Sequence, residues 1–326
     1  MLYWPKTLTE APRYIFDGAS SDLRPVFLTD FTRQPSDLWH KVLKFLVVGR
    51  IPLGARIVAW LTGFEGWKEL NRVRPTDRFM ADGVTNPRTL QAIAWILPKQ
   101  TRKFNYFNNC LRFALPGKDI DALMKRMKQM GFELATFDPD DAKQYDLLLT
   151  EQFYRPPTAE ELQSFNSSAR PTGTLDPSRT CQLNPVDCFF CGENKGRRAD
   201  LDIVAKTLKE NGLTHRFFIA DTKAEYICYD EYLKHLAACR SIVDWVKGDQ
   251  KGLTRRPVEA IFWQKKLITN NRNIKTADFY HPDNIFIWGD DDPATLPYFI
   301  NSPLYPIDNA IVQRYHVDHW LEYFEL

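Results

Sequence analysis

Residues 241–280 read SIVDWVKGDQKGLTRRPVEAIFWQKKLITNNRNIKTADFY, and this stretch decides the fold. It opens with an apolar run at 241–246, whose length is typical of a buried strand. A polar turn with two glycines follows at 247–254, and apolar residues at helical spacing then predict an amphipathic helix with Pro257 in its first turn. The segment 266–269 predicts the next strand. Together these elements predict a βαβ unit of a parallel sheet.

Polar residues of this unit gather where the first strand ends and the helix begins. Ligands of open parallel α/β sheets bind at the carboxyl ends of the strands. A glycine loop before a helix exposes N–H groups that favour an anion, and Arg256 would add a fork of donors that matches phosphate. Glu259, one turn later, is placed to accept hydrogen bonds from sugar hydroxyls. An ordinary βαβ turn is the alternative interpretation. We expect a ligand beside Gly252, Thr254, Arg256 and Glu259.

Length, charge and cysteine usage limit the class of protein. A chain of 326 residues is long enough for two domains. Its 43 lysines and arginines nearly balance 41 aspartates and glutamates, which argues against a general nucleic-acid-binding protein. Six irregularly spaced cysteines predict reduced thiols. Because neither a signal-peptide pattern nor a long uncharged apolar run is visible, we expect a cytoplasmic protein.

Strand and helix patterns alternate along the rest of the chain, which predicts further parallel βαβ units. A G-x-G-x-x-G fingerprint after the first strand is absent, so an NAD-type oxidoreductase is disfavoured. Outside the opening stretch, strands are expected at residues 25–30, 78–83, 103–109, 132–137, 188–191, 215–219 and 284–288. Helices are expected after Asn86 and at 119–130, 199–210 and 230–239.

The region 155–186 is rich in proline, serine and threonine, a composition typical of a linker. We therefore predict an N-terminal domain at 1–160, a linker at 161–186 and a C-terminal domain at 187–326. We also expect the last helix to pack back on the first domain.

The second domain opens with a strand that leads into a basic turn. A strand-to-helix turn directs backbone donors and cations at phosphate, and Lys195, Arg197 and Arg198 gather here. A solvated basic turn is the alternative. Since this turn precedes the 241–280 unit by one βαβ repeat, the two turns are expected to face the same ligand.

Three other patterns are compatible with metal ions but favour structural roles. The cysteines of 188–191 lack a second ligand pair and flank two phenylalanines, which favours buried thiols. The carboxylates of 290–292 could bind a divalent cation, yet Asp292 before Pro293 is typical of a helix cap. The histidines of 316–319 lack an evident third ligand. We predict no metal site.

The segment 38–62 combines basic residues with tryptophan and phenylalanine in a helical pattern. It predicts either peripheral contact with anionic lipid at the inner face of the cytoplasmic membrane or two core-facing helices with solvated charges.

Four short segments form a recognisable series, namely GLTRRPVEA at 252–260, KKLITNN at 265–271, DFY at 278–280 and NIFI at 284–287. In this order and spacing they resemble one family of bacterial glycosyltransferase-like proteins that assemble lipopolysaccharide core, capsule or exopolysaccharide and are similar to GT-B enzymes. The resemblance is strong over 186–326 and weaker over 78–155. It implies two Rossmann-like domains facing a cleft, a nucleotide-sugar donor, a glycan or glycolipid acceptor, and no cofactor.

The resemblance also implies roles for single residues. Catalytic roles fall to Arg256, Lys195 and Glu259, and donor binding to Gly192, Arg197, Gly252, Leu253 and Thr254. Many retaining GT-B enzymes carry a further acid at the position that Lys251 holds here, so inverting and retaining chemistry both stay open. Asp30 and Asp82 are candidate acceptor bases. The alternative function is a non-catalytic nucleotide- or glycan-binding protein on a decayed transferase fold.

Overall fold

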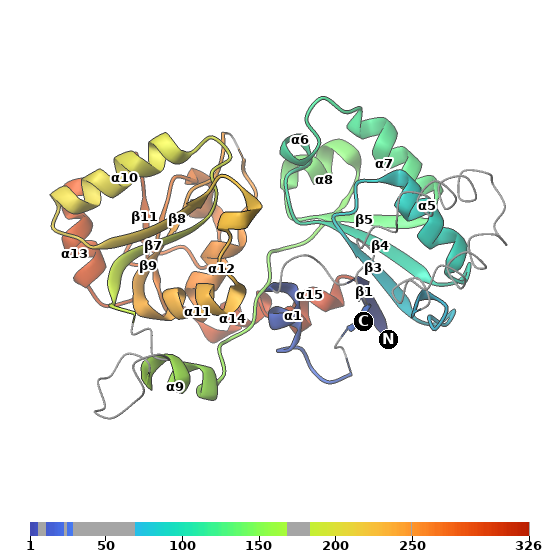
Figure 1. The fold of residues 1–326 in the computed structure, drawn as a ribbon, viewed down its shortest axis with the longest axis horizontal. Coiled ribbons are helices and arrows are strands. Elements are labelled where there is room, and N and C mark those ends of the chain that lie inside the picture. The colour runs from blue at the N-terminus through green and yellow to red at the C-terminus, as the bar shows by residue number, and fades with distance from the viewer. Residues whose placement is uncertain (6–10, 23–24, 29–68, 168–182, 249, 326) are drawn as a thin grey trace. The chain divides into compact units, whose positions relative to one another are not determined.

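The computed structural model describes residues 1–5, 11–22, 25–28, 69–167, 183–248 and 250–325 (Figure 1). The chain divides into two compact α/β units. The first contains Met1–Glu151 together with Leu321–Leu326, and the second contains Gln152–Trp320. The first unit thus ends before residue 160. Helix α9 (Ala159–Ser167) occupies the start of the expected linker, whose centre lies outside the described residues.

The first unit has a six-stranded parallel sheet in the order β2-β1-β3-β4-β5-β6. Its strands are β1 (Leu2–Pro5), β2 (Val26–Leu28), β3 (Arg78–Asp82), β4 (Arg102–Phe107), β5 (Phe132–Thr136) and β6 (Leu148–Leu149). Its helices in the range 1–151 are α1 (Ala11–Phe16), α5 (Pro87–Ile96), α6 (Leu111–Ala114), α7 (Ile120–Gln129) and α8 (Pro139–Tyr145). The predicted strands match β2 to β5 within about two residues, whereas β1 and β6 were not predicted.

Local chemistry explains the bounds of α7. The Asp119 side chain accepts from the backbone N of Ala122 at 2.9 Å and caps the first turn. Gly131 adopts φ +80° just after the helix, a conformation that favours glycine and ends the helix as predicted. The helix buries Met124 and Met127 in a core that includes Phe79 of β3.

The second unit has a five-stranded parallel sheet in the order β11-β10-β9-β7-β8. Its strands are β7 (Val186–Glu193), β8 (His215–Ala220), β9 (Cys239–Asp244), β10 (Lys266–Thr269) and β11 (Ile285–Ile287). Besides α9, its α-helices among the described residues are α10 (Arg198–Glu210), α11 (Tyr229–Ala238), α12 (Arg255–Phe262), α13 (Leu296–Asn301), α14 (Asn309–Arg314) and α15 (Val317–Glu322), which continues into the first unit. The βαβ unit predicted from 241–280 is confirmed.

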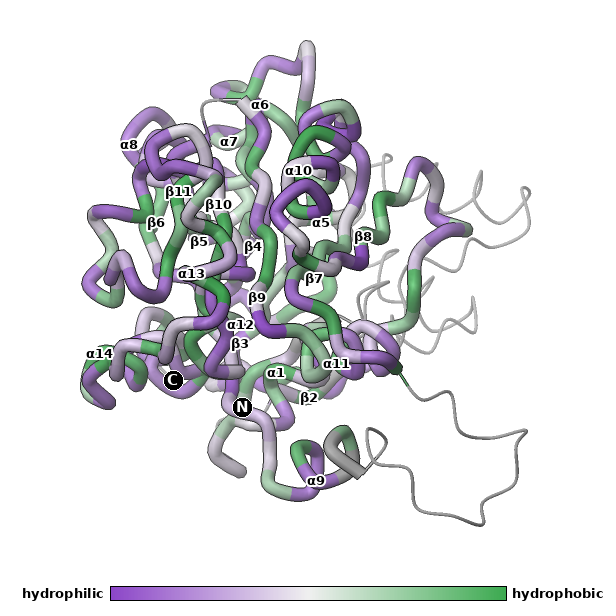
Figure 2. Tube along the Cα trace, turned by 90° about the vertical axis from the view of Figure 1, so that its left-hand side faces the viewer, coloured by the Kyte–Doolittle hydropathy of each residue, from purple (hydrophilic) through white to green (hydrophobic). Residues whose placement is uncertain are grey.

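Helices cover both faces of this second sheet. Figure 1 shows α10 and α13 on one face and α11 and α12 on the other. The α10 face buries Leu201, Val204 and Leu208 against Phe190 of β7. Hydrophobic and hydrophilic segments alternate along α10 in Figure 2, as expected of a helix with one buried side. The sheet is therefore buried on both sides, as parallel sheets usually are.

The two sheets share one strand order. If strands are counted from the start of each unit, both begin 2-1-3-4-5, the order of a doubly wound, Rossmann-like α/β fold. This confirms the predicted α/β class with two Rossmann-like domains.

Two predictions fall on residues that the structure does not describe. The segment 38–62, for which lipid contact and core-facing helices both stayed open, and Asp30, a candidate acceptor base, lie outside the described residues. Among the described helices, none combines the length and the apolar character that a membrane crossing requires.

Candidate functional site

The direction of strand addition reverses between β7 and β9 of the second unit. From β7 the chain first crosses to β8 on one side, and the later strands are then added on the other side, beginning with β9. In sheets of this order, ligands bind outside the carboxyl ends of the strands at this reversal. Gly192, the second-to-last residue of β7, and Trp245, just after β9, mark the place, which we call the switch point.

Two arginines converge on the switch point from the helices that begin there. Arg197 directly precedes α10, and its Nε donates to the backbone oxygen of Glu193 at 2.9 Å while its Nη1 donates to that of Trp245. Arg256 lies in the first turn of α12, and its Nη2 donates to the backbone oxygen of Cys191. Each guanidinium is thus held by strand-end carbonyls.

Gly192 leaves room for both guanidinium groups. A Cβ atom at this position would lie 2.7 Å from Nη2 of Arg256 and 2.8 Å from Nη2 of Arg197. The Cζ atoms of the same arginines lie 5.1 and 5.0 Å from the ring centroid of Phe190, which is a cation–π distance. The structure therefore brings together three residues singled out from the sequence, namely Gly192, Arg197 and Arg256.

Asp244, the last residue of β9, is a fully buried carboxylate that holds the start of α12. Its Oδ1 accepts from Thr254 Oγ1 at 2.8 Å and from Arg256 Nη1 at 3.4 Å, and its Oδ2 accepts from Thr269 Oγ1 at 3.4 Å. Thr254 is the N-cap of α12, and its Oγ1 accepts from the backbone N of Arg256 at 3.3 Å. Asp244 thus positions both the N-cap residue Thr254 and the guanidinium of Arg256.

Acidic groups flank both guanidinium groups at the switch point: Asp244 and Glu193 act on Arg197, and Asp244 and Glu259 act on Arg256. Burial and the charge of Arg256 lower the pKa of Arg197 to about 10. Burial also opposes the charge of Arg256, but Asp244 and neighbouring acidic groups outweigh it and raise the pKa of Arg256. A bound anion would relieve the repulsion between the arginines, and their planar donors suit phosphate.

Glu259 lies one turn after Arg256, yet its carboxylate faces the interior. The residue is only 4 % exposed and accepts a hydrogen bond from the hydroxyl of Tyr232 on α11. Burial raises the pKa of Glu259, while Tyr232, Arg255 and Arg256 act in the opposite direction. The sequence predicted contact with sugar hydroxyls, whereas the carboxylate is engaged here in holding Tyr232.

Two asparagines after β10 anchor the loop between β9 and α12. Asn270 Oδ1 accepts from the backbone N of Val246 at 2.8 Å, and its Nδ2 donates to the oxygen of Val246 at 3.0 Å. Asn271 Nδ2 donates to the oxygen of Gly252 at 3.5 Å. Gly252 is buried and Leu253 is partly exposed. The glycine loop, whose backbone N–H groups were predicted to favour an anion, is therefore anchored by the residues that follow β10.

Lys195 occupies a different place from the one predicted. Its Nζ lies 3.3 Å from Glu193 Oε2, and it lines a pocket at the ends of β7 and β8 together with Asp221 and Tyr226. The sequence predicted that Lys195 and Arg256 meet the same phosphate from two sides. The structure instead places Arg197 beside Arg256, because Arg197 lies at the base of α10 whereas Lys195 lies in the turn before it.

The acidic run at 290–292 has protein partners at every carboxylate. Asp290 pairs with Arg272 and Lys275, both at 2.7 Å, and Asp291 Oδ2 accepts from the backbone N of Ile287 at 2.6 Å. Asp292 accepts from the backbone N of Ala294 at 3.0 Å, which confirms the predicted cap. The five described cysteines are free thiols. Cys188 is fully buried as expected, whereas Cys191 is partly exposed.

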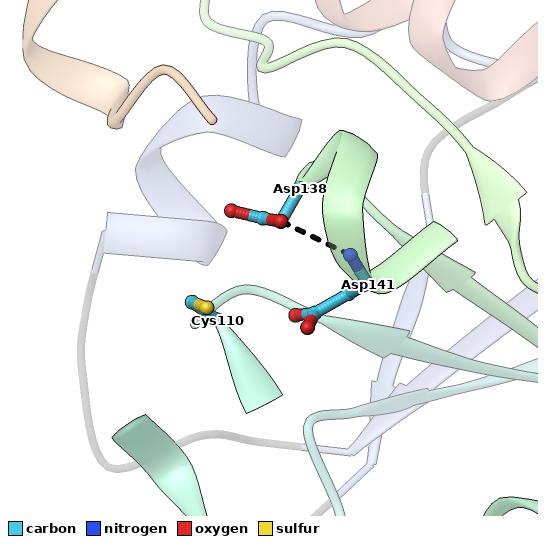
Figure 3. A group of neighbouring side chains, drawn as sticks. All are labelled: Cys110, Asp138 and Asp141. Atoms are coloured by element: carbon cyan, nitrogen blue, oxygen red, sulfur yellow. Dashed lines mark hydrogen bonds between the residues drawn. The ribbon is translucent and has the colours of Figure 1, made fainter. Parts of the chain in front are cut away.

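Within the described residues, one group brings three candidate metal ligands together, Cys110, Asp138 and Asp141 of the first unit (Figure 3). Their ligand atoms lie within 4.8 Å of one another. Asp138 caps α8 by accepting from the backbone N of Asp141 at 3.1 Å, and Asp141 accepts from that of Leu111 at 2.7 Å. Burial and the two carboxylates raise the pKa of Cys110 to about 12. Through these contacts, the three residues link the start of α6 to the start of α8 in the interior of the first unit.

Sequence reasoning missed Asp244 and Tyr232 as parts of the site. Asp244 was assigned only to an apolar strand, although an aspartate inside the run SIVDWV is itself a signal, since a buried carboxylate needs a partner. Tyr232 carries no such signal, because its bond to Glu259 joins residues on different helices.

No family model matches the chain, and no curated protein matches it. The resemblance to GT-B-like glycosyltransferases therefore stays a prediction.

Proposed function

We propose that the chain is a glycosyltransferase that moves a sugar from a nucleotide-sugar donor to a lipopolysaccharide, capsule or related glycan, with its two Rossmann-like units in a GT-B-like arrangement. The observation that carries the proposal is the convergence of Arg197 and Arg256 over Gly192 at the switch point. A doubly wound sheet binds ligands at this point, and two converging guanidinium groups there suit a diphosphate.

The arginines would act on the leaving group. In glycosyl transfer the bond between the anomeric carbon and the diphosphate oxygen breaks, the acceptor oxygen bonds to that carbon, and the acceptor proton passes to a base. Negative charge grows on the diphosphate as its bond breaks. Preorganised cations stabilise that charge more in the transition state than in the ground state, which is what raises turnover. Asp244 would hold Arg256 in place for this task.

Binding is tested first with a panel of nucleoside diphosphates and nucleotide sugars. A ligand that binds the folded protein raises its melting temperature. We expect one nucleotide series to do so equally with and without EDTA, because the guanidinium groups supply the counter-charge. If the shift disappeared with EDTA and returned with Mn²⁺, the diphosphate would be bound through a metal and this assignment would be wrong.

Turnover is tested with Arg256→Ala and the donor found in the panel. Losing one preorganised electrostatic donor typically costs about a hundredfold in turnover. Arg240→Ala is the matched control, because Arg240 lies near the opposite end of β9 and contacts Asp187 and Asn301. Near-normal turnover by a folded Arg256→Ala protein would place the chemistry elsewhere. Donor binding without transfer or hydrolysis would favour a non-catalytic nucleotide-binding protein.

A further inference from the structure

A polar pocket of about 360 Å³ lies at the carboxyl ends of β7 and β8, beside the switch point. This volume falls within the range of about 300–1,000 Å³ that small-molecule sites occupy. The pocket adjoins the arginines through Glu193, whose backbone oxygen accepts from Arg197 at 2.9 Å while the residue also lines the pocket. Its walls come from the turn 193–195 and the segment 220–226.

Side-chain hydrogen bonds join the two walls. The hydroxyl of Tyr226 donates to the carboxylate of Glu193, and Asn194 Nδ2 donates to Asp221 Oδ1 at 2.7 Å. Arg198 Nη2 donates to the other oxygen of Asp221 at 2.6 Å. The bond to Glu193 keeps Tyr226 at the pocket, and the residue is still 43 % exposed, so its aromatic ring can be reached by a ligand.

The pocket and the switch point differ in the side chains that line them. In the pocket, Lys195 pairs with Glu193 at 3.3 Å, Arg198 pairs with Asp221 at 2.6 Å, and Lys223 also lines the wall. At the switch point, the guanidinium groups of Arg197 and Arg256 converge over Gly192. Two planar guanidinium groups suit a phosphate group. A group with hydroxyls and an aromatic ring suits the pocket, because carboxylates accept from hydroxyls and Tyr226 can stack.

We infer that the pocket binds the nucleoside of the donor, with the ribose hydroxyls on Asp221 and Glu193 and the base against Tyr226. This inference rests on the proposed function, since it takes the diphosphate to lie at Arg197 and Arg256. In this arrangement the ribose contacts Asp221 and Glu193 and not Glu259, and the orientation of the donor along the sheet edge is fixed. The nucleoside lies over β8, and the sugar extends toward the β9 side of the switch point.

The test separates the nucleoside from the phosphates by calorimetric titration. The probes are inorganic pyrophosphate and the diphosphates of uridine, guanosine, adenosine and cytidine. Removing a stacking ring should weaken the best nucleoside diphosphate by about tenfold in Tyr226→Ala, with pyrophosphate affinity unchanged. Tyr226→Phe keeps the ring and should retain most of the affinity. Asp221→Ala provides a second variant, and Tyr298→Ala, a residue 78 % exposed on α13, is the control.

Each result either supports or overturns the inference. If folded Tyr226→Ala and Asp221→Ala proteins keep wild-type affinity for the nucleoside diphosphate while Arg256→Ala loses it, the nucleoside lies elsewhere and the proposed function stands. If Tyr226→Ala weakens pyrophosphate as much as the nucleoside diphosphate, the pocket holds phosphate. If the wild-type protein binds neither probe, the proposed function itself fails. Melting temperatures and circular dichroism establish that each variant is folded.

Discussion

Gly192 shows how the absence of a side chain can shape a site. Its backbone lies outside the left-handed region, so an alanine could adopt the same conformation. What excludes a side chain is space, because Nη2 of Arg256 and Nη2 of Arg197 would lie 2.7 and 2.8 Å from a Cβ atom. Two like charges approach this closely only where carbonyls and a carboxylate hold them, as Asp244 and the strand-end oxygens do.

Gly192→Ala should therefore displace the arginines without unfolding the protein. Each guanidinium is the flexible end of a long side chain, so it can move, but it then leaves its carbonyl partner. We expect pyrophosphate affinity to fall by about tenfold or more, as is usual when a hydrogen bond to a charged group is lost. Calorimetric titration measures this loss, and thermal unfolding shows whether stability changes.

Gly212→Ala is the control, because it should lower stability and leave pyrophosphate affinity unchanged. Gly212 adopts φ +72°, and a Cβ atom there would meet nothing within 4 Å. Alanine in this conformation costs about 1 kcal/mol of stability, and pyrophosphate binding should not change. Equal pyrophosphate affinity in wild type and Gly192→Ala would mean that the two arginines do not form the anion site.

Residue identities were easier to predict than residue environments. Arg256 and Gly192 were found because glycine and arginine near a strand end carry a local signal. The surroundings of Glu259 and Lys195 were not predicted. Glu259 is buried against Tyr232 and Lys195 pairs with Glu193, and sequence spacing does not encode either contact.

At the scale of elements, α11 packs against β7 through a buried histidine. His235 is 3 % exposed and lies between Phe189 and Phe218, with ring centroids 5.6 and 4.9 Å away. Its Nδ1 lies 2.9 Å from Nη1 of Arg216 on β8. An arginine nitrogen can only donate, so Nδ1 accepts and the ring is neutral.

This packing predicts a loss of stability in mild acid. Burial and Arg216 lower the pKa of His235 below 6.5, and Glu231 opposes them. Between the lowered pKa and 6.5, the unfolded chain binds a proton that the folded chain does not. Stability should therefore fall as the pH drops through 6.5, and the loss is complete below the folded pKa. His235→Asn keeps an acceptor but does not titrate, so its free energy of unfolding should depend less on pH.

Denaturant titrations at several pH values between 5 and 8 measure the two slopes. Burial also lowers the pKa of His215 and His316, so part of the wild-type slope should remain in the variant. Identical slopes in both proteins would show that His235 takes up its proton as easily in the folded as in the unfolded state.

The elements were predicted well where one local signal bounds them. The strand at 266–269 and the start of α12 follow from a short segment that two asparagines end and from Pro257 in the first helical turn. Gly192 was assigned to a turn, but pairing with Ile219 of β8 keeps it in β7. Strand β6 has two exposed leucines and is recognised only by its pairing with β5. Pairing partners lie far apart in sequence, and single-sequence patterns do not show them.

At the scale of the whole molecule, alternating strands and helices predicted two parallel α/β units because βαβ crossovers require that pattern. The return of the chain end to the first unit was also expected, although the alternation of strands and helices does not imply it. The structure assigns Leu321–Leu326 to that unit. Phe324 is fully buried there, 5.0 Å from Phe104 of β4 in an edge-to-face arrangement, and Glu325 pairs with Arg102 at 2.5 Å.

Phe324→Ala should therefore destabilise the first sheet selectively. Removing a buried phenylalanine costs about 3–5 kcal/mol, through lost transfer energy and the cavity left behind. Because β4 loses a packing partner, hydrogen exchange of its amides should become faster, while the amides of β9 should change much less. Phe299→Ala is the matched control, since Phe299 is 7 % exposed and packs on Phe286 in the second unit. It should accelerate exchange in β9 and β10 and leave β4 protected. If both variants accelerated both sheets equally, the two units would open as one cooperative body, and the chain end would not belong to the first unit alone.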